Sequence, residues 1–203
     1  MNICVYGAAS SVIDQYYIDI VEKLCTELGS HGHNLIFGAG DCGLMGAAAR
    51  GFKAGGGRVT GIVPSFFRTE RVEALYEQSD QILFTQNMGT RKDVMEENSD
   101  AFIITPGGIG TFDEFFQILT LKQLKQHNKP IALFNINGYY YSIQALVHNG
   151  VEEKFIKDHT LDMYRCFDEK QIPELIEYVE TPPEENMLRV EDMKFGGFEQ
   201  QNR

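Results

Sequence analysis

The residues best suited to chemistry lie in a glycine-rich loop that leads into a helix. Residues 106–111 read Pro-Gly-Gly-Ile-Gly-Thr and follow the apolar run 101–105 directly. Three glycines in four positions expose backbone amides, and a helix starting there adds its positive N-terminal dipole, so the loop is suited to hold a phosphate. Glu114 follows in what we expect to be the first helical turn, where the dipole helps keep a carboxylate ionised. The alternative is a capping box, in which Thr111 and Glu114 only bond the backbone, but this leaves the glycines unexplained.

A second candidate group is the sequence Thr90-Arg91-Lys92 at the start of another predicted helix. The helix dipole disfavours cations at that position, so an isolated Arg-Lys pair would ordinarily be read as solvated surface charge. This loop, however, is expected on the ligand side of the sheet, where a bound anion would offset the unfavourable placement.

Two further loops follow predicted strands. Residues 7–11 read Gly-Ala-Ala-Ser-Ser, and Ser10 or Ser11 could cap the next helix. Residues 38–43 read Gly-Ala-Gly-Asp-Cys-Gly and match the G-x-G-x-x-G pattern of dinucleotide sites. That fingerprint also needs an acidic residue about 20 positions on, and residues 61–65 (Gly-Ile-Val-Pro-Ser) contain none. We therefore expect a ligand-facing loop and no NAD site.

The elements that must position these loops alternate along the chain. Short apolar runs predict strands at 3–6, 35–37, 59–63, 81–84, 101–105, 131–134 and 163–167, and periodic stretches predict helices at 12–29, 43–55, 90–98, 111–126, 139–150 and 172–179. Several runs are continuously apolar, which is typical of strands covered on both faces. The predicted fold is α/β, with a doubly wound, mainly parallel, Rossmann-like sheet and helices on both faces. Residues 1–180 form the single predicted domain, and 181–203 a polar tail.

Composition narrows the function classes. The formal net charge is -11, which disfavours binding to nucleic acid or an anionic membrane. No apolar run approaches the roughly 20 residues of a membrane helix, and the N-terminus lacks a signal-peptide pattern, so the cytoplasm is the expected location. The four cysteines form no C-x-x-C pair, and His31 and His33 only flank a turn. No metal site is predicted.

Taken together, these motifs resemble the LONELY GUY (LOG) family. The paired signature is Arg91-Lys92 followed by Pro-Gly-Gly-x-Gly-Thr-x-x-Glu at 106–114, and further matching segments run in family order from about residue 2 to 180. The resemblance implies a phosphoribohydrolase that cleaves the N-glycosidic bond of purine nucleoside 5′-monophosphates, with N6-modified adenine among the candidate bases. Members were often labelled lysine decarboxylases, but no lysine here lies in a recognisable pyridoxal phosphate setting.

The resemblance also implies roles for individual residues. Arg91 and Glu114 would be the catalytic pair, with no metal and no organic cofactor. A glutamate upstream of the Arg-Lys pair contacts ligand in the family, and Glu73 fits the spacing best, with Glu70 as the alternative. The remaining predicted substrate-binding residues are Ser10, Met88, Lys92, Gly107, Gly108, Ile109, Gly110, Thr111 and Thr120. The alternative function is a non-catalytic nucleotide sensor or carrier on the same fold.

The predicted helix 111–126 also suggests a homodimer. On a helical wheel Phe112, Phe115, Phe116 and Leu119 share one face, whereas Ile118, Leu121 and Leu124 point elsewhere. A helix that is apolar on more than one face is buried on more than one side, and a second subunit could supply the cover. The resemblance implies the same. The alternative is that the C-terminal segment folds back over this helix.

Overall fold

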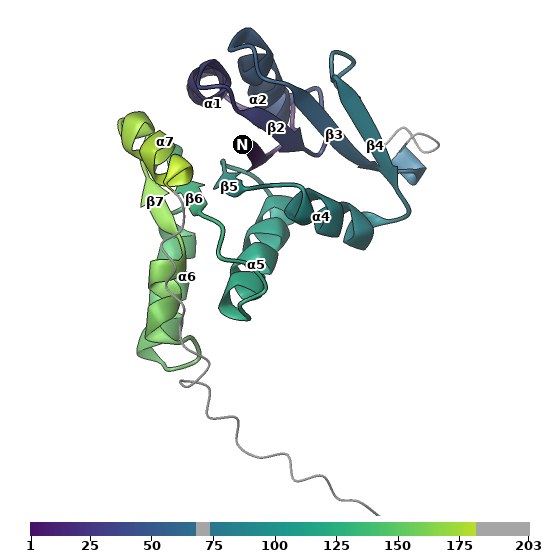
Figure 1. The fold of residues 1–203 in the computed structure, drawn as a ribbon. Helices are drawn as coiled ribbons and strands as arrows, with labels where there is room; N and C mark the ends of the chain where they lie inside the picture. The colour runs from purple at the N-terminus through teal and green to yellow at the C-terminus, as the bar shows by residue number, and fades with distance from the viewer. Residues whose placement is uncertain (68–73, 182–203) are drawn as a thin grey trace, which may run out of the picture.

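The protein is described here by a computed structural model, which covers residues 1–67 and 74–181. Within these ranges a 7-stranded sheet has the order β4-β3-β2-β1-β5-β6-β7, and every neighbouring pair is parallel (Figure 1). This confirms the predicted doubly wound α/β fold. The strands are β1 (Asn2–Tyr6), β2 (Asn34–Phe37), β3 (Val59–Pro64), β4 (Gln81–Thr85), β5 (Ala101–Ile104), β6 (Ile131–Phe134) and β7 (Arg165–Phe167).

Helices cover both faces of the sheet (Figure 1). Apolar residues of three helices share one core with β1 and β2: α1 (Gln15–Ser30), α2 (Gly43–Ala54) and α7 (Ile172–Glu180). Three others contribute to the core of the opposite face: α4 (Met88–Glu97), α5 (Ile109–Gln123) and α6 (Tyr141–Glu152). Short 3-10 turns at Ile136–Gly138 and Asp158–Met163 complete the described elements. Among the described residues, no helix combines the length and apolarity needed to cross a membrane.

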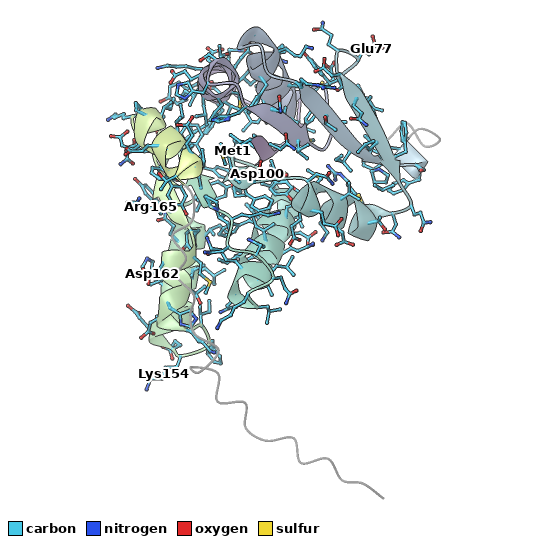
Figure 2. All side chains as sticks on the ribbon, viewed as in Figure 1. Met1, Glu77, Asp100, Lys154, Asp162 and Arg165 are labelled. Atoms are coloured by element: carbon cyan, nitrogen blue, oxygen red, sulfur yellow. The ribbon has the colours of Figure 1, made fainter. Side chains whose placement is uncertain are left out.

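The central strands explain why the apolar runs are continuous. All four residues of β5 and all four of β6 are buried, because helices lie above and below them. The edge strand β4 is buried only at its last residue. At the starts of the strands, Met1 and Asp100 lie close together (Figure 2), and the Asp100 carboxylate accepts a hydrogen bond from the Asn2 amide at 2.7 Å.

The strand order places a crevice between β1 and β5. The chain runs outward from β1 through β2 and β3 to β4, then returns to β5 on the other side of β1. The loops after β1 and β5 therefore part in opposite directions at the carboxyl edge, which is where such sheets bind ligands. The sequence-predicted loops 7–11 and 106–111 are the two that flank this switch point.

Four predicted helix starts differ from the structure by two or three residues: those of α1, α4, α5 and α6. Helix α1 begins at Gln15 and not at residue 12, and its cap is Asp14, whose carboxylate accepts from the Tyr16 amide at 2.8 Å. Ser10 and Ser11 remain in the loop before it. Helix α5 begins at Ile109, two residues earlier than predicted, with Gly108 as its N-cap and no side-chain cap hydrogen bond. Serine and threonine near these helix starts are typical capping residues, but the backbone path of each loop places a different residue at the cap position.

Candidate active site

Arg91 and Glu114 lie together in the interior, although they come from different helices. Arg91 is the fourth residue of α4 and Glu114 the sixth of α5. Arg91 Nη1 is 3.8 Å from Glu114 Oε1, and the two side chains are only 8% and 10% exposed. The reading of Arg91 as a solvated surface charge is therefore wrong. A buried ion pair of this kind is costly to desolvate, so it calls for an explanation other than stability.

The guanidinium of Arg91 is held in one orientation by its surroundings. Its Nε donates to the carbonyl oxygen of Ile62, on β3, at 3.1 Å. Its Nη1 also lies 3.8 Å from the sulfur of Met88. On the far side the fork approaches Gly38 so closely that a Cβ there would overlap Nη2. The Arg91 guanidinium is thus held at the carboxyl edge of the sheet in one orientation. Only its Nε bonds to Ile62, so the N–H groups of Nη1 and Nη2 are not used by that bond.

Glu114 differs in protonation from the sequence-based expectation. It lies in the second turn of α5 and not the first, because the helix starts at Ile109. Burial raises its pKa from the usual 4.5 to about 7, and the Asp113 carboxylate adds to the rise, whereas Arg91 and Lys92 oppose it. The effect of desolvation on the pKa of Glu114 is therefore larger than the opposing effects of the helix dipole and of the adjacent cations. The helix start also excludes the capping box, since Thr111 is inside the helix.

The loop 106–111 is held rigidly but leaves room in front of it. The Tyr139 hydroxyl donates to the carbonyl of Gly107, and the Tyr140 hydroxyl to that of Thr105, each at 2.6 Å. A Cβ at Gly107 would overlap the Thr111 side chain. At Gly108 and Gly110, by contrast, an added Cβ would meet nothing within 4 Å.

The amides of this loop are available to an anion. The first helical hydrogen bond of α5 runs from the Phe112 amide to the Gly108 carbonyl, so the amides of residues 109–111 precede the helix's own bonding pattern. Both Gly108 and Ile109 are exposed. Free amides at the positive end of a helix, with open space before them, have the chemistry of a phosphate site.

A cavity of about 320 Å³ adjoins the loop at the switch point. Its wall joins the loop after β1 and the start of α1 to the loop after β5, and the Ala8 amide donates to the Pro106 carbonyl at 3.1 Å across this junction. The lining residues are Ala8, Ile13, Asp14, Tyr17, Leu44, Pro106, Gly107, Gly108 and Tyr139. The loop thus has the cavity on its α1 side and the Arg91–Glu114 pair on its α4–α5 side.

The second glycine-rich loop has a different explanation. Gly38 makes room for Arg91, and a Cβ at Gly46 would overlap the Asp41 carbonyl. Gly43 has a φ of 59° and lies against the carbonyls of Ala8 and Ser10. Gly38 and Gly43, two of the three glycines of the apparent fingerprint, are thus accounted for by the protein's own atoms, which supports the rejection of a dinucleotide site.

The remaining predicted residues are distributed around this centre. Lys92 bridges α4 to α5 through Asp113, with Nζ 2.7 Å from Oδ2. Met88 is 39% exposed beside Arg91, and Ser10 is exposed in the loop after β1. Thr120 lies in a groove of about 560 Å³ between α4 and α5, on the same lining as Asp113. Glu70 and Glu73 lie outside the described residues.

Sequence reasoning assigned no role to several residues of the site. Tyr139 fixes the glycine loop, and Asp14 and Tyr17 line the adjoining cavity. The sequence contained only a weak signal for Tyr139, which belongs to the Asn-Gly-Tyr-Tyr segment at 137–140. Asp14 and Tyr17 carried none, because their relevance depends on where α1 begins.

The chain matches known proteins over most of its length. Residues 45–179 match a protein-family model described as "Possible lysine decarboxylase". The sequence is 37% identical over 153 residues to the "Probable cytokinin riboside 5′-monophosphate phosphoribohydrolase LOGL3" of Oryza sativa subsp. japonica, covering 75% of this chain and 72% of that protein. It is 36% identical over 155 residues to the "Cytokinin riboside 5′-monophosphate phosphoribohydrolase LOG1" of Arabidopsis thaliana, covering 76% and 72%.

Solved structures show the same fold at low sequence identity. The molybdenum cofactor carrier protein of Chlamydomonas reinhardtii superposes with a TM-score of 0.65 at 18% identity, over 89% of this chain and 98% of the other. A structural-genomics target, TM1055, gives 0.62 at 20% identity, over 87% and 98%. At these identities the likeness concerns the fold alone.

Proposed function

Because the chain belongs to the LOG family, whose curated relatives are cytokinin riboside 5′-monophosphate phosphoribohydrolases, we propose that it hydrolyses the N-glycosidic bond of purine nucleoside 5′-monophosphates. Water adds its oxygen to C1′ of the ribose, the bond from C1′ to the base nitrogen breaks, and the products are free base and ribose 5-phosphate. The observation that carries this proposal is the buried Arg91–Glu114 pair beside a rigid, open glycine loop.

Glu114 is the proposed catalytic carboxylate. Cleavage of a glycosidic bond passes through a transition state resembling an oxocarbenium ion, which a carboxylate beside C1′ stabilises. The ionised group can also accept a proton from the attacking water. A carboxylate with a pKa of about 7 is divided between its two forms near neutral pH and is a stronger base than an ordinary glutamate. Burial, which is unfavourable for an ionised group, would thus serve the reaction.

Arg91 and the loop are proposed to position the substrate. The phosphate would rest on the amides of residues 109–111, and this binding energy would hold C1′ against Glu114. The free donors of Arg91 would contact substrate oxygens, a role for which the planar guanidinium suits better than an ammonium. Lys92, already paired with Asp113, would contribute positive charge near the phosphate.

Two alternative functions make different predictions. A lysine decarboxylase that uses pyridoxal phosphate needs a lysine free to form a Schiff base, whereas Lys92, the lysine beside the pair, is held 2.7 Å from Asp113. A nucleotide sensor or carrier needs no carboxylate at the reacting carbon.

The test is to incubate the purified protein with AMP and to measure free adenine and ribose 5-phosphate by chromatography. AMP should be cleaved, and adenosine much more slowly, because only AMP offers a phosphate to the loop. Binding of AMP without base release would favour the carrier. A panel of nucleoside monophosphates, including N6-modified adenines, would then define the base preference.

We also propose a cytoplasmic homodimer. All four cysteines are free thiols, as is usual in a reducing compartment. The dimer was predicted from the apolar faces of α5, but Ile118 is only 1% exposed and belongs to the chain's own core, so it cannot contribute to an interface. The apolar residues of α5 that a second subunit could cover are the partly buried Phe116 and Leu121 and also Leu124, which is 59% exposed. Light scattering at micromolar concentration should give twice the chain mass; a monomer would reject the dimer.

A further inference from the structure

Three side chains suited to metal binding converge at the edge of the sheet opposite to the candidate active site. His31 Nδ1 lies 2.7 Å and His33 Nε2 2.8 Å from the same oxygen, Oε1 of Glu180. One ligand atom from each of the three lies within 4.8 Å of the others. We propose that His31, His33 and Glu180 bind a first-row transition metal ion, with Zn²⁺ the best-suited ion.

The backbone fixes the position of all three residues. The two histidines flank Gly32, whose φ of 82° allows the tight turn between α1 and β2. The turn is closed by hydrogen bonds from the His31 amide to the Glu27 carbonyl and from the His33 amide to the Leu28 carbonyl, at 3.1 and 3.2 Å. Glu180 is the last residue of α7, whose Val179 is fully buried in the core.

The two imidazoles differ in freedom. His33 is 8% exposed, and its Nδ1 faces the Met1 nitrogen at 3.4 Å, which leaves Nε2 as the nitrogen directed at Glu180. The His31 side chain is 47% exposed at the end of α1. One ligand is therefore fixed, and another can adjust to an ion.

Two imidazole nitrogens and one carboxylate oxygen form a ligand set typical of zinc sites that keep an open position. Calcium and magnesium prefer oxygen ligands throughout. Metal–ligand distances of about 2.0–2.2 Å place tetrahedral ligands about 3.3 Å apart, so the present contacts would have to widen by about 0.5 Å. The half-exposed His31 side chain has room to make this shift. The fourth ligand could be water or a nearby carboxylate, because Glu27 and Glu177 line the same groove of about 500 Å³.

The competing interpretation is a metal-free clamp. In it both imidazoles donate N–H hydrogen bonds to Glu180 and simply hold α7 against the turn before β2. The two interpretations differ in what an added metal ion does. Neither depends on nucleotide hydrolysis, because His33 and Gly38 lie at opposite ends of β2, whose four residues span about 13 Å.

The experiment uses the full chain, purified without a histidine tag and stripped of metal with a chelator. Co²⁺ is titrated as a spectroscopic probe and then displaced with Zn²⁺. We expect one saturable site with the visible absorption of four-coordinate Co²⁺. Zn²⁺ at about 100 times its Kd should raise the Tm by about 5–10 °C.

Variants locate the ion. His31→Ala and Glu180→Gln should each weaken Zn²⁺ binding by about tenfold or more. The matched control is His148→Ala, which removes an exposed histidine on α6 and should change nothing. Circular dichroism and unchanged AMP cleavage by His31→Ala would show that the fold is intact.

Three outcomes would overturn the proposal. Absence of saturable Co²⁺ or Zn²⁺ binding at micromolar concentration would leave only the clamp. Parent-like affinity in His31→Ala or in Glu180→Gln would place the ion elsewhere. An equal loss in His148→Ala would indicate binding by surface histidines in general.

Discussion

Two glycine-rich loops follow buried strands at the same edge of this sheet, and their glycines serve opposite purposes. In the segment 38–46, which runs from the loop after β2 into the first turn of α2, the space that a side chain would fill is occupied by the protein: Arg91 fills it at Gly38, and the Asp41 carbonyl at Gly46. In the loop 106–111, the space in front of Gly108 and Gly110 is open. The first loop matches a dinucleotide fingerprint letter for letter, yet the second has the properties of a ligand site. A glycine motif therefore indicates that other atoms lie close to the backbone, but it does not show whether they belong to a ligand or to the protein itself.

Both segments also bear on the proposed reaction centre. Gly38 in the first segment makes room for Arg91, and the loop 106–111 begins the helix that carries Glu114. The first would act only through Arg91, whereas the second would touch the substrate itself. Substitutions in the two loops should therefore separate stability from activity.

The largest effect is expected at the carboxylate that both loops support. Glu114→Gln keeps the shape and removes the charge, so AMP turnover should fall by about 10²–10⁴-fold while AMP binding is largely retained. Steady-state kinetics and calorimetric titration measure the two. Glu97→Gln, at the end of α4, is the control and should keep parental turnover. Undiminished turnover in Glu114→Gln would remove Glu114 from the mechanism.

A matched pair of alanine substitutions tests the two loops directly. Gly38→Ala forces a Cβ into the Arg91 guanidinium and should lower the free energy of unfolding by about 1–3 kcal/mol, with loss of activity. Gly110→Ala, exposed within the first turn of α5, should raise it by about 0.5–1 kcal/mol, because alanine is the better helix former.

Despite this gain in stability, Gly110→Ala should increase the KM for AMP about tenfold or more by crowding the phosphate. Urea unfolding and kinetics on both variants would check the pair. Equal stability changes in the two variants, or an unchanged KM in Gly110→Ala, would show that the glycines of the two loops do not have different roles.

The pH dependence should report the burial of Glu114. If the ionised form acts, kcat/KM should fall about tenfold per pH unit below about 7. The pH dependence of stability should have the opposite sign. The folded state binds the Glu114 proton more tightly than the unfolded state does. The contribution of this proton to the free energy of unfolding is therefore complete below about pH 4.5 and is lost as the pH rises through about 7. Glu114→Gln should consequently gain up to about 3 kcal/mol over the parent at pH 8. An acid limb near pH 4.5 would show that Glu114 is not desolvated.

The smallest expected effect concerns the support of the open loop. Tyr139→Phe removes the hydroxyl that holds the Gly107 carbonyl, which should cost about 0.5–1.5 kcal/mol and raise the KM for AMP a few-fold, with kcat nearly unchanged. Tyr141→Phe, on an exposed neighbour, is the control. A change in kcat alone would mean that Tyr139 acts on the reacting atoms and not on the loop.

The sequence by itself determined the fold and the main candidates for the site. Continuous apolar runs such as 101–105 and 131–134 marked the buried parallel strands, and the glycines after residue 105 marked the loop that we propose to bind the phosphate. Both features can be recognised from neighbouring residues, because the run of apolar side chains along a strand and the unbonded amides at a helix start are local in the sequence. Arg91 and Glu114, which the family resemblance had singled out, do lie 3.8 Å apart, and their catalytic role stays a prediction.

Tertiary structure decided the rest, because it depends on which distant segments meet. Desolvation by the surrounding core sets the pKa of Glu114 against the direction that its helix dipole suggested. Gly38 is glycine because of an arginine 53 positions later, and His31 and His33 meet a carboxylate that is 147 residues from His33 in the sequence. These contacts join segments that are distant in the sequence, so no local pattern predicts them. Tertiary packing brings the residues together and thereby sets the electrostatics at both ends of the sheet.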